Sequence, residues 1–132
     1  MRLEISKLIK RYGDRTVLDI ENLVIEKGKI TGIIGPNGCG KSTLMNIISG
    51  LDENFTGTIQ YDGSYLDKDI TRNMTYVFQK PYLFKRSVYE NICYPLKIRS
   101  VKPKEQEERV LNIIKKLEIE NLTEKRADKL SG

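Results

Sequence analysis

The first half of the chain alternates apolar and polar residues in a way that predicts β-strands. Leu3 and Ile5 alternate with charged or hydroxyl-bearing neighbours within residues 2–12, which indicates a half-buried strand. A second, less regular pattern of this kind covers residues 18–26. Residues 57–63 predict a further strand that ends in an Asp-Gly turn.

Two short runs are almost entirely apolar instead of alternating. They cover residues 30–34 and residues 74–78. The run 30–34 is typical of a strand that is covered on both faces, as in a parallel sheet, and the run 74–78 is a further strand candidate. We therefore expect both segments to be strands.

Apolar residues at helical spacing follow in three places. The helix predicted from Ser42 has apolar positions at 44, 47, 48 and 51, with Gly50 as its stop. Ser87 and Glu90 form a Ser-x-x-Glu capping box that predicts a helix start. Pro103 opens an amphipathic stretch with apolar positions at 110, 113, 114 and 117. Strands thus dominate residues 1–79, and helices dominate residues 87–132.

A glycine-rich loop lies between the apolar run 30–34 and the first predicted helix. It fits G-x-x-x-x-G-K-[ST] at every fixed position, in the strand–loop–helix context that a phosphate loop requires. Glycines let backbone N–H groups turn around a phosphate, and the helix start adds positive potential. Lys41 can reach the β- and γ-phosphates, Ser42 can bind Mg²⁺, and Thr43 can donate to an α-phosphate oxygen. The residues of this loop are Gly35, Pro36, Asn37, Gly38, Cys39, Gly40, Lys41 and Ser42.

Composition excludes several other kinds of chemistry. The 132 residues include no histidine and two cysteines, so a Ser-His-Asp triad, a histidine metal ligand and a Cys₄ zinc site are excluded. The net charge of +5 comes from scattered basic residues, Lys10 among them, which we expect on a solvated surface and not at a nucleic-acid interface. With no signal peptide and no apolar run of roughly 20 residues, a cytosolic chain with Cys39 and Cys93 as free thiols is expected.

Residues 35–44 closely resemble the Walker A sequence of ATP-binding-cassette (ABC) ATPases. Tyr12 resembles the aromatic residue that precedes the loop in that family. Gln79, at the end of the run 74–78, resembles the Q-loop. The last residues, Leu130, Ser131 and Gly132, resemble the first half of the LSGGQ signature.

The resemblance covers the whole chain and implies an α/β fold: a P-loop NTPase of ABC type with an incomplete core sheet. Residues 1–132 would be the N-terminal part of one ABC ATPase domain. Residues 1–86 would form the β-rich part with Walker A and the Q-loop, and residues 87–132 would form the start of the helical subdomain.

The resemblance also implies roles for individual residues, with ATP and Mg²⁺ as cofactors. Tyr12 would stack on adenine, and Ser42 and Gln79 would help coordinate Mg²⁺. The segment from Gln79 to about Tyr94 would touch transmembrane permease subunits. The phosphates would be held by Gly35, Pro36, Asn37, Gly38, Cys39, Gly40, Lys41, Ser42 and Thr43.

The implied assembly is a transporter on the inner face of the cell membrane, with no nucleic-acid partner. Ser131 and Gly132 would face the ATP of a second cassette, packed head to tail. Binding and hydrolysis of ATP would drive transport.

Catalytic residues of the family are absent from these 132 residues. No apolar run ends in a Walker B aspartate and catalytic glutamate, and there is no switch histidine. Phosphoryl transfer depends on such positioned groups, so this chain alone is expected to hydrolyse ATP only at background rate. It is also expected to bind MgATP weakly or not at all. The strand expected at residues 30–34 would also lack its parallel partners.

Three other interpretations remain open. Small nucleotide kinases share the loop but usually begin with it, whereas two predicted strands precede it here. A translation-type ABC ATPase fits, while a DNA-repair type would need a long coiled-coil insertion after Gln79. A non-enzymatic nucleotide-binding fragment is the third. Within transporters, residues 77–84 and 87–92 resemble importer cassettes, in particular those that serve oxyanions such as tungstate, phosphate or sulfate.

Overall fold

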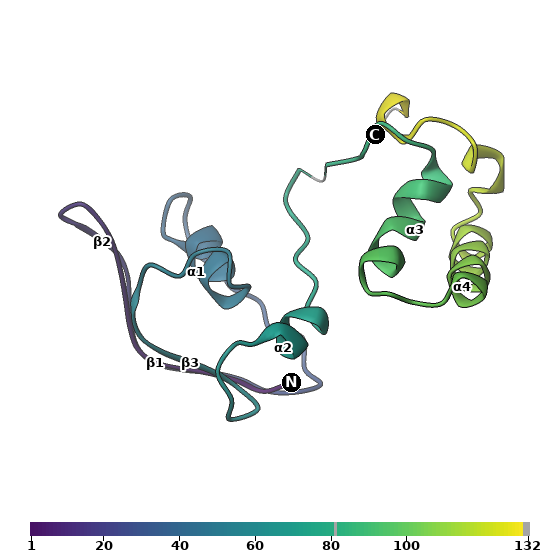
Figure 1. Cartoon of the computed structure of the whole chain (residues 1–132). Coiled ribbons are helices and arrows are strands. Elements are labelled where there is room, and N and C mark those ends of the chain that lie inside the picture. The colour runs from purple at the N-terminus through teal and green to yellow at the C-terminus, as the bar shows by residue number, and fades with distance from the viewer. Residues whose placement is uncertain (81, 131–132) are drawn as a thin grey trace. The chain divides into compact units, whose positions relative to one another are not determined.

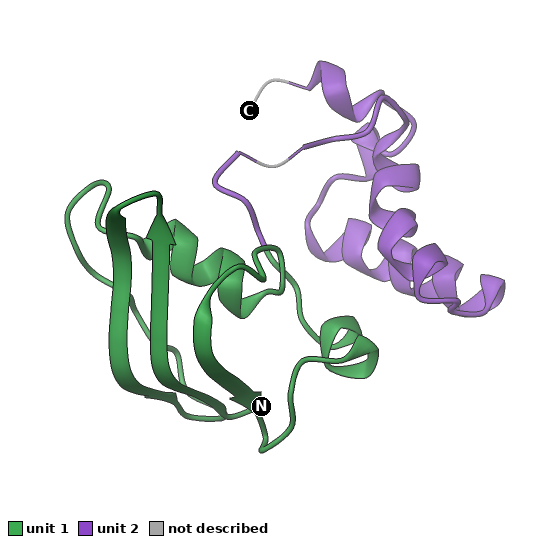
Figure 2. Cartoon of the chain, turned by 60° about the vertical axis from the view of Figure 1, so that its left-hand side comes forward, with its two compact units in different colours: residues 1–76 green, residues 77–132 purple. Residues whose placement is uncertain are grey.

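The computed structural model describes residues 1–80 and 82–130 and divides into two compact units, residues 1–76 and residues 77–132 (Figure 2). The first unit holds the strands and two helices, and the second is helical (Figure 1). The chain is thus a mixed α/β protein, as the sequence predicts.

The first unit is built on an antiparallel sheet. Its described strands are β1 (Leu3–Tyr12), β2 (Arg15–Ile25) and β3 (Thr56–Tyr61), in the order β2-β1-β3. These are the three strands that the alternating patterns predict. Two helices complete the unit, α1 (Lys41–Ile48) and the short α2 (Lys68–Arg72).

A β-bulge at Lys7 decides which side chains of β1 face the core. Ile5 and Leu8 are consecutive core residues, yet they lie three positions apart instead of two. Lys7, between them, has φ 51°, and the pairing with β3 shifts register at the same place. Because alternation restarts after the bulge, Lys10 and Tyr12 lie on the same face as Ile5.

Gly57 of β3 makes room for this bulge. It has φ 98°, and a Cβ atom there would overlap the carbonyl group of Lys7. A side chain at this position would therefore clash with backbone that cannot move aside easily. The absence of a side chain at Gly57 is what lets β3 approach the bulge.

Helix α1 covers one face of the sheet and begins where the sequence predicts. Leu44 and Ile47 are buried against the side chains of β1 and β3. The phenol of Tyr61 in β3 donates a hydrogen bond to the carbonyl of Ile48 at the last turn of α1. Burial raises the pKa of Tyr61, so this donor stays protonated. The chain then leaves the helix at Gly50, whose φ is 72°.

The two apolar runs are not strands in this structure, so that prediction is wrong for both. Residues 30–34 have no ladder partner among the described residues, and Ile30 and Ile34 are almost fully exposed. Residues 74–78 are likewise irregular, with Val77 and Phe78 exposed. A strand requires a hydrogen-bonded neighbour, and the described strands are all antiparallel and pair elsewhere. The core sheet is incomplete, as expected.

The second unit packs two main helices. α3 (Val88–Ile98) starts at the predicted capping box, with the Glu90 N–H donating to the Ser87 hydroxyl at 3.1 Å. α4 (Pro103–Lys116) starts at the predicted proline. Two 3₁₀ turns follow, η1 (Glu120–Leu122) and η2 (Ala127–Lys129). The helices bury Cys93, Val110 and Ile114 between them.

In the part of the chain that the structure describes, no helix has the length and apolar character needed to cross a membrane. The longest, α4, carries charged residues along much of its surface.

Replacing Gly57 by alanine should destabilise the first unit more than the same change at another glycine of positive φ. Strain at φ 98° and the backbone clash together should lower the free energy of unfolding by about 3 kcal/mol. The matched control is Gly63→Ala, at φ 84° with open space around its Cβ position, which should cost about 1 kcal/mol. Urea unfolding followed by circular dichroism measures both. Equal losses would show that the bulge does not need a glycine opposite it.

Candidate functional site

The glycine-rich loop lies against β2 and leads directly into α1. Gly38 and Gly40 have φ 78° and 97°, a backbone conformation that other residues rarely adopt. A Cβ at Gly40 would lie 2.7 Å from the Leu18 side chain and 3.0 Å from the Val17 carbonyl oxygen. These glycines therefore set both the loop's curvature and its close packing on the sheet.

The start of α1 is open to an anion. Gly40 is the N-cap residue and offers no side chain to the first N–H groups, and the first turn holds no acidic residue. Helix N–H groups at this end have no intrahelical acceptor, and the helix dipole adds positive potential. The Ser42 hydroxyl is exposed beside them, and Thr43 is half-buried. Residues 35–39 are exposed as well.

The Lys41 ammonium folds back over the loop. It donates to the carbonyl oxygens of Gly35 at 2.7 Å and Pro36 at 2.8 Å. It also lies 3.7 Å from the Cys39 sulfur, and a Cβ at Gly35 would meet that sulfur at 2.7 Å. The cation is thus held at the mouth of the loop by weak neutral acceptors, which an anion can replace.

Tyr12 presents an open aromatic surface at the end of β1. Its side chain is 55% exposed, and its hydroxyl donates to Oδ2 of Asp52 at 3.3 Å. The Lys10 ammonium lies 4.8 Å from the centre of the ring. Tyr12 is therefore held by Lys10 and Asp52 while more than half of its side chain stays exposed to solvent.

Lys10 does not lie on the solvated surface, contrary to the prediction for the scattered basic residues. It is only 2% exposed, and its ammonium donates to Asp52 Oδ1 at 2.8 Å and to the Asn54 carbonyl at 2.6 Å. The sequence indicated only that Lys10, two residues before Tyr12, lies on the same face of its strand as Tyr12. No sequence pattern pointed to Asp52 as its partner, because Asp52 is 42 residues away in the sequence.

The carboxylate of Asp52 gathers three donors. Besides Lys10 and Tyr12, the Asn54 N–H donates to it at 3.0 Å. Hydrogen bonding to Lys10 is the main cause that lowers the pKa of Asp52, and partial burial opposes it. Asp52 is therefore ionised at neutral pH.

The other predicted site residues lie outside the first unit. Gln79 is exposed and belongs to the second unit, so its joint role with Ser42 at a magnesium ion stays a prediction. Ser131 and Gly132 lie outside the described residues. Among the described residues, no group of three or more Cys, Asp or Glu side chains is arranged as a metal site.

An aromatic cluster follows Gln79 in the second unit. The rings of Tyr82 and Phe84 meet edge to face at 5.9 Å, and Phe84 lies 4.7 Å from Tyr94 of α3. The Asn91 side chain ties this segment to α3. It accepts from the Phe84 N–H at 2.9 Å and donates to the carbonyls of Phe84 and Ser87 at 3.1 and 2.9 Å. We call Tyr82, Phe84 and Tyr94 the aromatic cluster.

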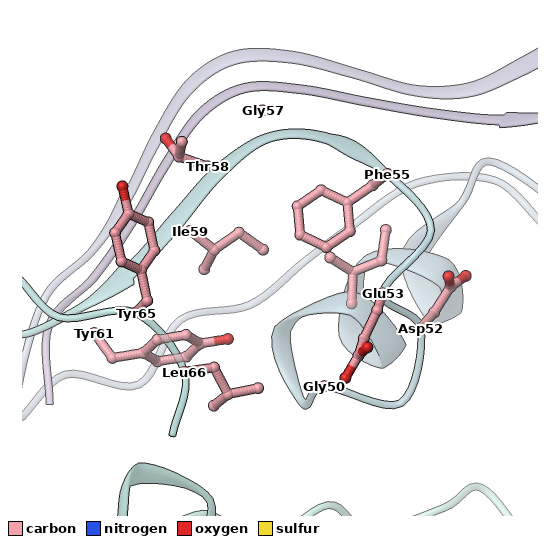
Figure 3. Close-up of a pocket in the computed structure, with 11 residues that line it drawn as sticks. Gly50, Asp52, Glu53, Phe55, Gly57, Thr58, Ile59, Tyr61, Tyr65 and Leu66 are labelled. Atoms are coloured by element: carbon pink, nitrogen blue, oxygen red, sulfur yellow. The ribbon is translucent and has the colours of Figure 1, made fainter. Parts of the chain in front are cut away.

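A pocket of about 300 Å³ lies between β3 and the end of α1 (Figure 3). Apolar side chains such as Phe55, Ile59 and Leu66 form most of its wall. Asp52 is at its edge, with the carboxylate turned away from the interior. None of the predicted site residues lines this pocket, so it is separate from the glycine-rich loop.

Comparison with known proteins decides the family. A model of the family described as ABC transporter matches residues 18–132. The chain belongs to the ABC transporter family.

Relatives and solved structures agree with this membership. The chain is 53% identical over 132 residues to the tungstate uptake system ATP-binding protein TupC of Peptoclostridium acidaminophilum, which covers all of this chain and 61% of that protein. It is 34% identical to the Fe(3+) ions import ATP-binding protein FbpC of Vibrio cholerae, over 97% of this chain and 37% of that protein. The structure of cbiO1 from Clostridium perfringens, part of the ABC transporter complex cbiONQ, aligns with a TM-score of 0.81 and 31% identity, over 98% of this chain and 55% of that one. The chain therefore spans less than two thirds of each of these proteins.

The two cysteines of this ABC family member should differ in reactivity because only Cys39 is exposed. Cys93 is 3% exposed and contacts the Gln106 side chain at 3.4 Å. We expect one thiol to react with a maleimide in the native protein and two to react in denaturant, as counted by mass spectrometry. The control variant Cys39→Ser should show no rapid reaction. Equal native reactivity of both thiols would contradict the packing of α3 on α4.

Proposed function

We propose that this chain is the nucleotide-binding part of an ATP-binding cassette in an ABC importer. The observation that carries the proposal is the loop before α1, where two glycines of positive φ, an uncapped helix start and the Lys41 ammonium converge. These groups have the positive charge and the hydrogen-bond donors that the phosphates of a nucleoside triphosphate need.

The residues present fit MgATP, with different residues for the phosphates, the magnesium ion and the adenine. The backbone of residues 35–43 and the start of α1 bind the phosphates, and Lys41 leaves the Gly35 and Pro36 carbonyls to pair with them. The exposed hydroxyl of Ser42 and the amide of Gln79 are oxygen donors suited to Mg²⁺, which neutralises phosphate charge when bound. The exposed ring of Tyr12 would stack on the adenine.

The proposed partners are permease subunits and a second cassette. Within the aromatic cluster Tyr82 and Phe84 are exposed and Tyr94 is half-buried. Tyrosine and phenylalanine are enriched at protein interfaces. The aromatic cluster would bind the permease at the inner face of the membrane. Ser131 and Gly132 would contact the ATP of the second cassette. Hydrolysis of ATP by the whole cassette would drive transport.

An oxyanion is the proposed cargo of the transporter. The support is the 53% identity with the ATP-binding protein of a tungstate uptake system. The cargo itself would bind to other subunits, so this chain would supply the energy-coupling part only.

Replacing Lys41 by alanine should weaken MgATP binding to the intact protein by about tenfold to a hundredfold. The reason is the loss of charge-assisted hydrogen bonds to phosphate. Isothermal titration calorimetry measures the affinity. Lys68→Ala, which removes an exposed lysine of α2 in the same unit, should leave it unchanged. Equal affinities of wild type and Lys41→Ala would contradict the proposed phosphate site.

Replacing Asn91 by alanine should weaken binding to the permease without changing the affinity for MgATP. The side chain holds the segment that carries Phe84, and its loss releases the backbone of that segment from α3. Co-purification with the permease should fall several-fold, while MgATP affinity stays at the wild-type value. Asn121→Ala, at an exposed position in η1, is the matched control. Undiminished permease binding by the Asn91 variant would argue that the aromatic cluster is not the docking surface.

A further inference from the structure

We propose that Lys10 and Asp52 are positioning residues for the base of the nucleotide, acting through the ring of Tyr12. The proposal deepens the nucleotide-binding function above and rests on it, because it assumes that Tyr12 stacks on the base. Both residues lie outside the phosphate loop, and their role is inferred from contacts in the folded chain.

The first step is the burial of Lys10. An ammonium group in a protein interior is costly unless each of its N–H donors finds an acceptor. At 2% exposure, Lys10 has three such partners: Asp52 Oδ1, the Asn54 carbonyl oxygen and the face of the Tyr12 ring. A methionine or leucine would fill this position more cheaply. Packing alone therefore does not require a lysine at this position.

The second step concerns the two faces of the Tyr12 ring. The ammonium at 4.8 Å from the ring centre occupies one face in a cation–π contact. The side chain nevertheless remains 55% exposed, so much of the ring that the ammonium does not cover is accessible to solvent. A planar base can stack there only, which fixes the side from which it approaches.

The third step is the hydrogen bond from the Tyr12 hydroxyl to Asp52. It ties the far end of the ring to the segment just after α1, at 3.3 Å. Asp52 is itself held by the Lys10 ammonium and by the Asn54 N–H. The ring is thus restrained at its face and at its tip by groups from two parts of the chain, and less motion has to be lost when the base binds.

The geometry also links the base to the phosphates. Asp52 follows the C-terminal end of α1, and Lys41 stands at the N-terminal end of the same helix. Helix α1, about 12 Å long, and the three residues that follow it therefore connect Lys41, which pairs with phosphate, to Asp52, which orients the ring. This arrangement sets the base and the triphosphate at a defined distance from each other.

The experiment compares MgATP with magnesium tripolyphosphate, which lacks the base and sugar, on the intact protein. Asp52→Asn should lower ATP affinity by about threefold to tenfold and leave tripolyphosphate affinity unchanged, and Lys10→Met should do the same. Tyr12→Ala removes the ring itself and should cause the largest loss of ATP affinity, about tenfold or more. The control Asp69→Asn, which breaks an exposed ion pair in α2, should change neither affinity.

A double-variant test separates positioning from general destabilisation. If Asp52 acts through the ring, Asp52→Asn should have no further effect on ATP affinity once Tyr12 is alanine. A parallel loss of tripolyphosphate affinity, or the same loss of ATP affinity with and without the Tyr12 ring, would overturn the proposal.

Failure of the underlying function has a different signature. If Tyr12→Ala leaves the ratio of the two affinities unchanged, Tyr12 does not stack on the base and the positioning role falls with it. If Lys41→Ala leaves both affinities unchanged, the phosphate site itself is wrong. The two failures are therefore distinguishable from a failure of the Lys10–Asp52 pair alone.

Discussion

The close approach of Gly57 to the bulge at Lys7 is the constraint on which the first unit depends. Without the bulge, strict alternation would place residues 7, 9 and 11 on the core face of β1 instead of 8, 10 and 12. Leu8 would then leave the core, and Lys10 and Tyr12 would point away from Asp52. One backbone irregularity, allowed by one missing side chain in β3, therefore sets both the hydrophobic core and the aromatic platform.

The glycine-rich loop follows a different principle. Its shape comes from the backbone, because Gly38 and Gly40 take conformations that suit glycine and because Gly40 packs directly on Val17 and Leu18. An anion can take the place of the present partners of the Lys41 ammonium, since these are the neutral carbonyl oxygens of Gly35 and Pro36 and the Cys39 sulfur. A loop shaped by glycines, with one lysine that can change partners, can bind a phosphate reversibly.

Apolar surface marks where the described structure is incomplete as a sheet. Ile30, Ile34 and Val77 lie on segments whose composition suits buried strands, yet they are exposed. Composition alone does not make a strand, because each strand needs a hydrogen-bonded neighbour to satisfy its backbone. The contrast with β1, which has a partner on each side, shows that pairing and not propensity decides these segments.

The sequence by itself determined the features that depend on neighbours along the chain. These are the capping box at Ser87, the proline start of α4, and the phosphate loop, which together with Tyr12, Gln79 and residues 130–132 indicated the family. Only the tertiary structure revealed the burial of Lys10, its pairing with Asp52 and the bulge that orients Tyr12. The physical reason is separation: Lys10 and Asp52 are 42 residues apart, so their contact depends on how β1 and the end of α1 pack, and no local pattern records it.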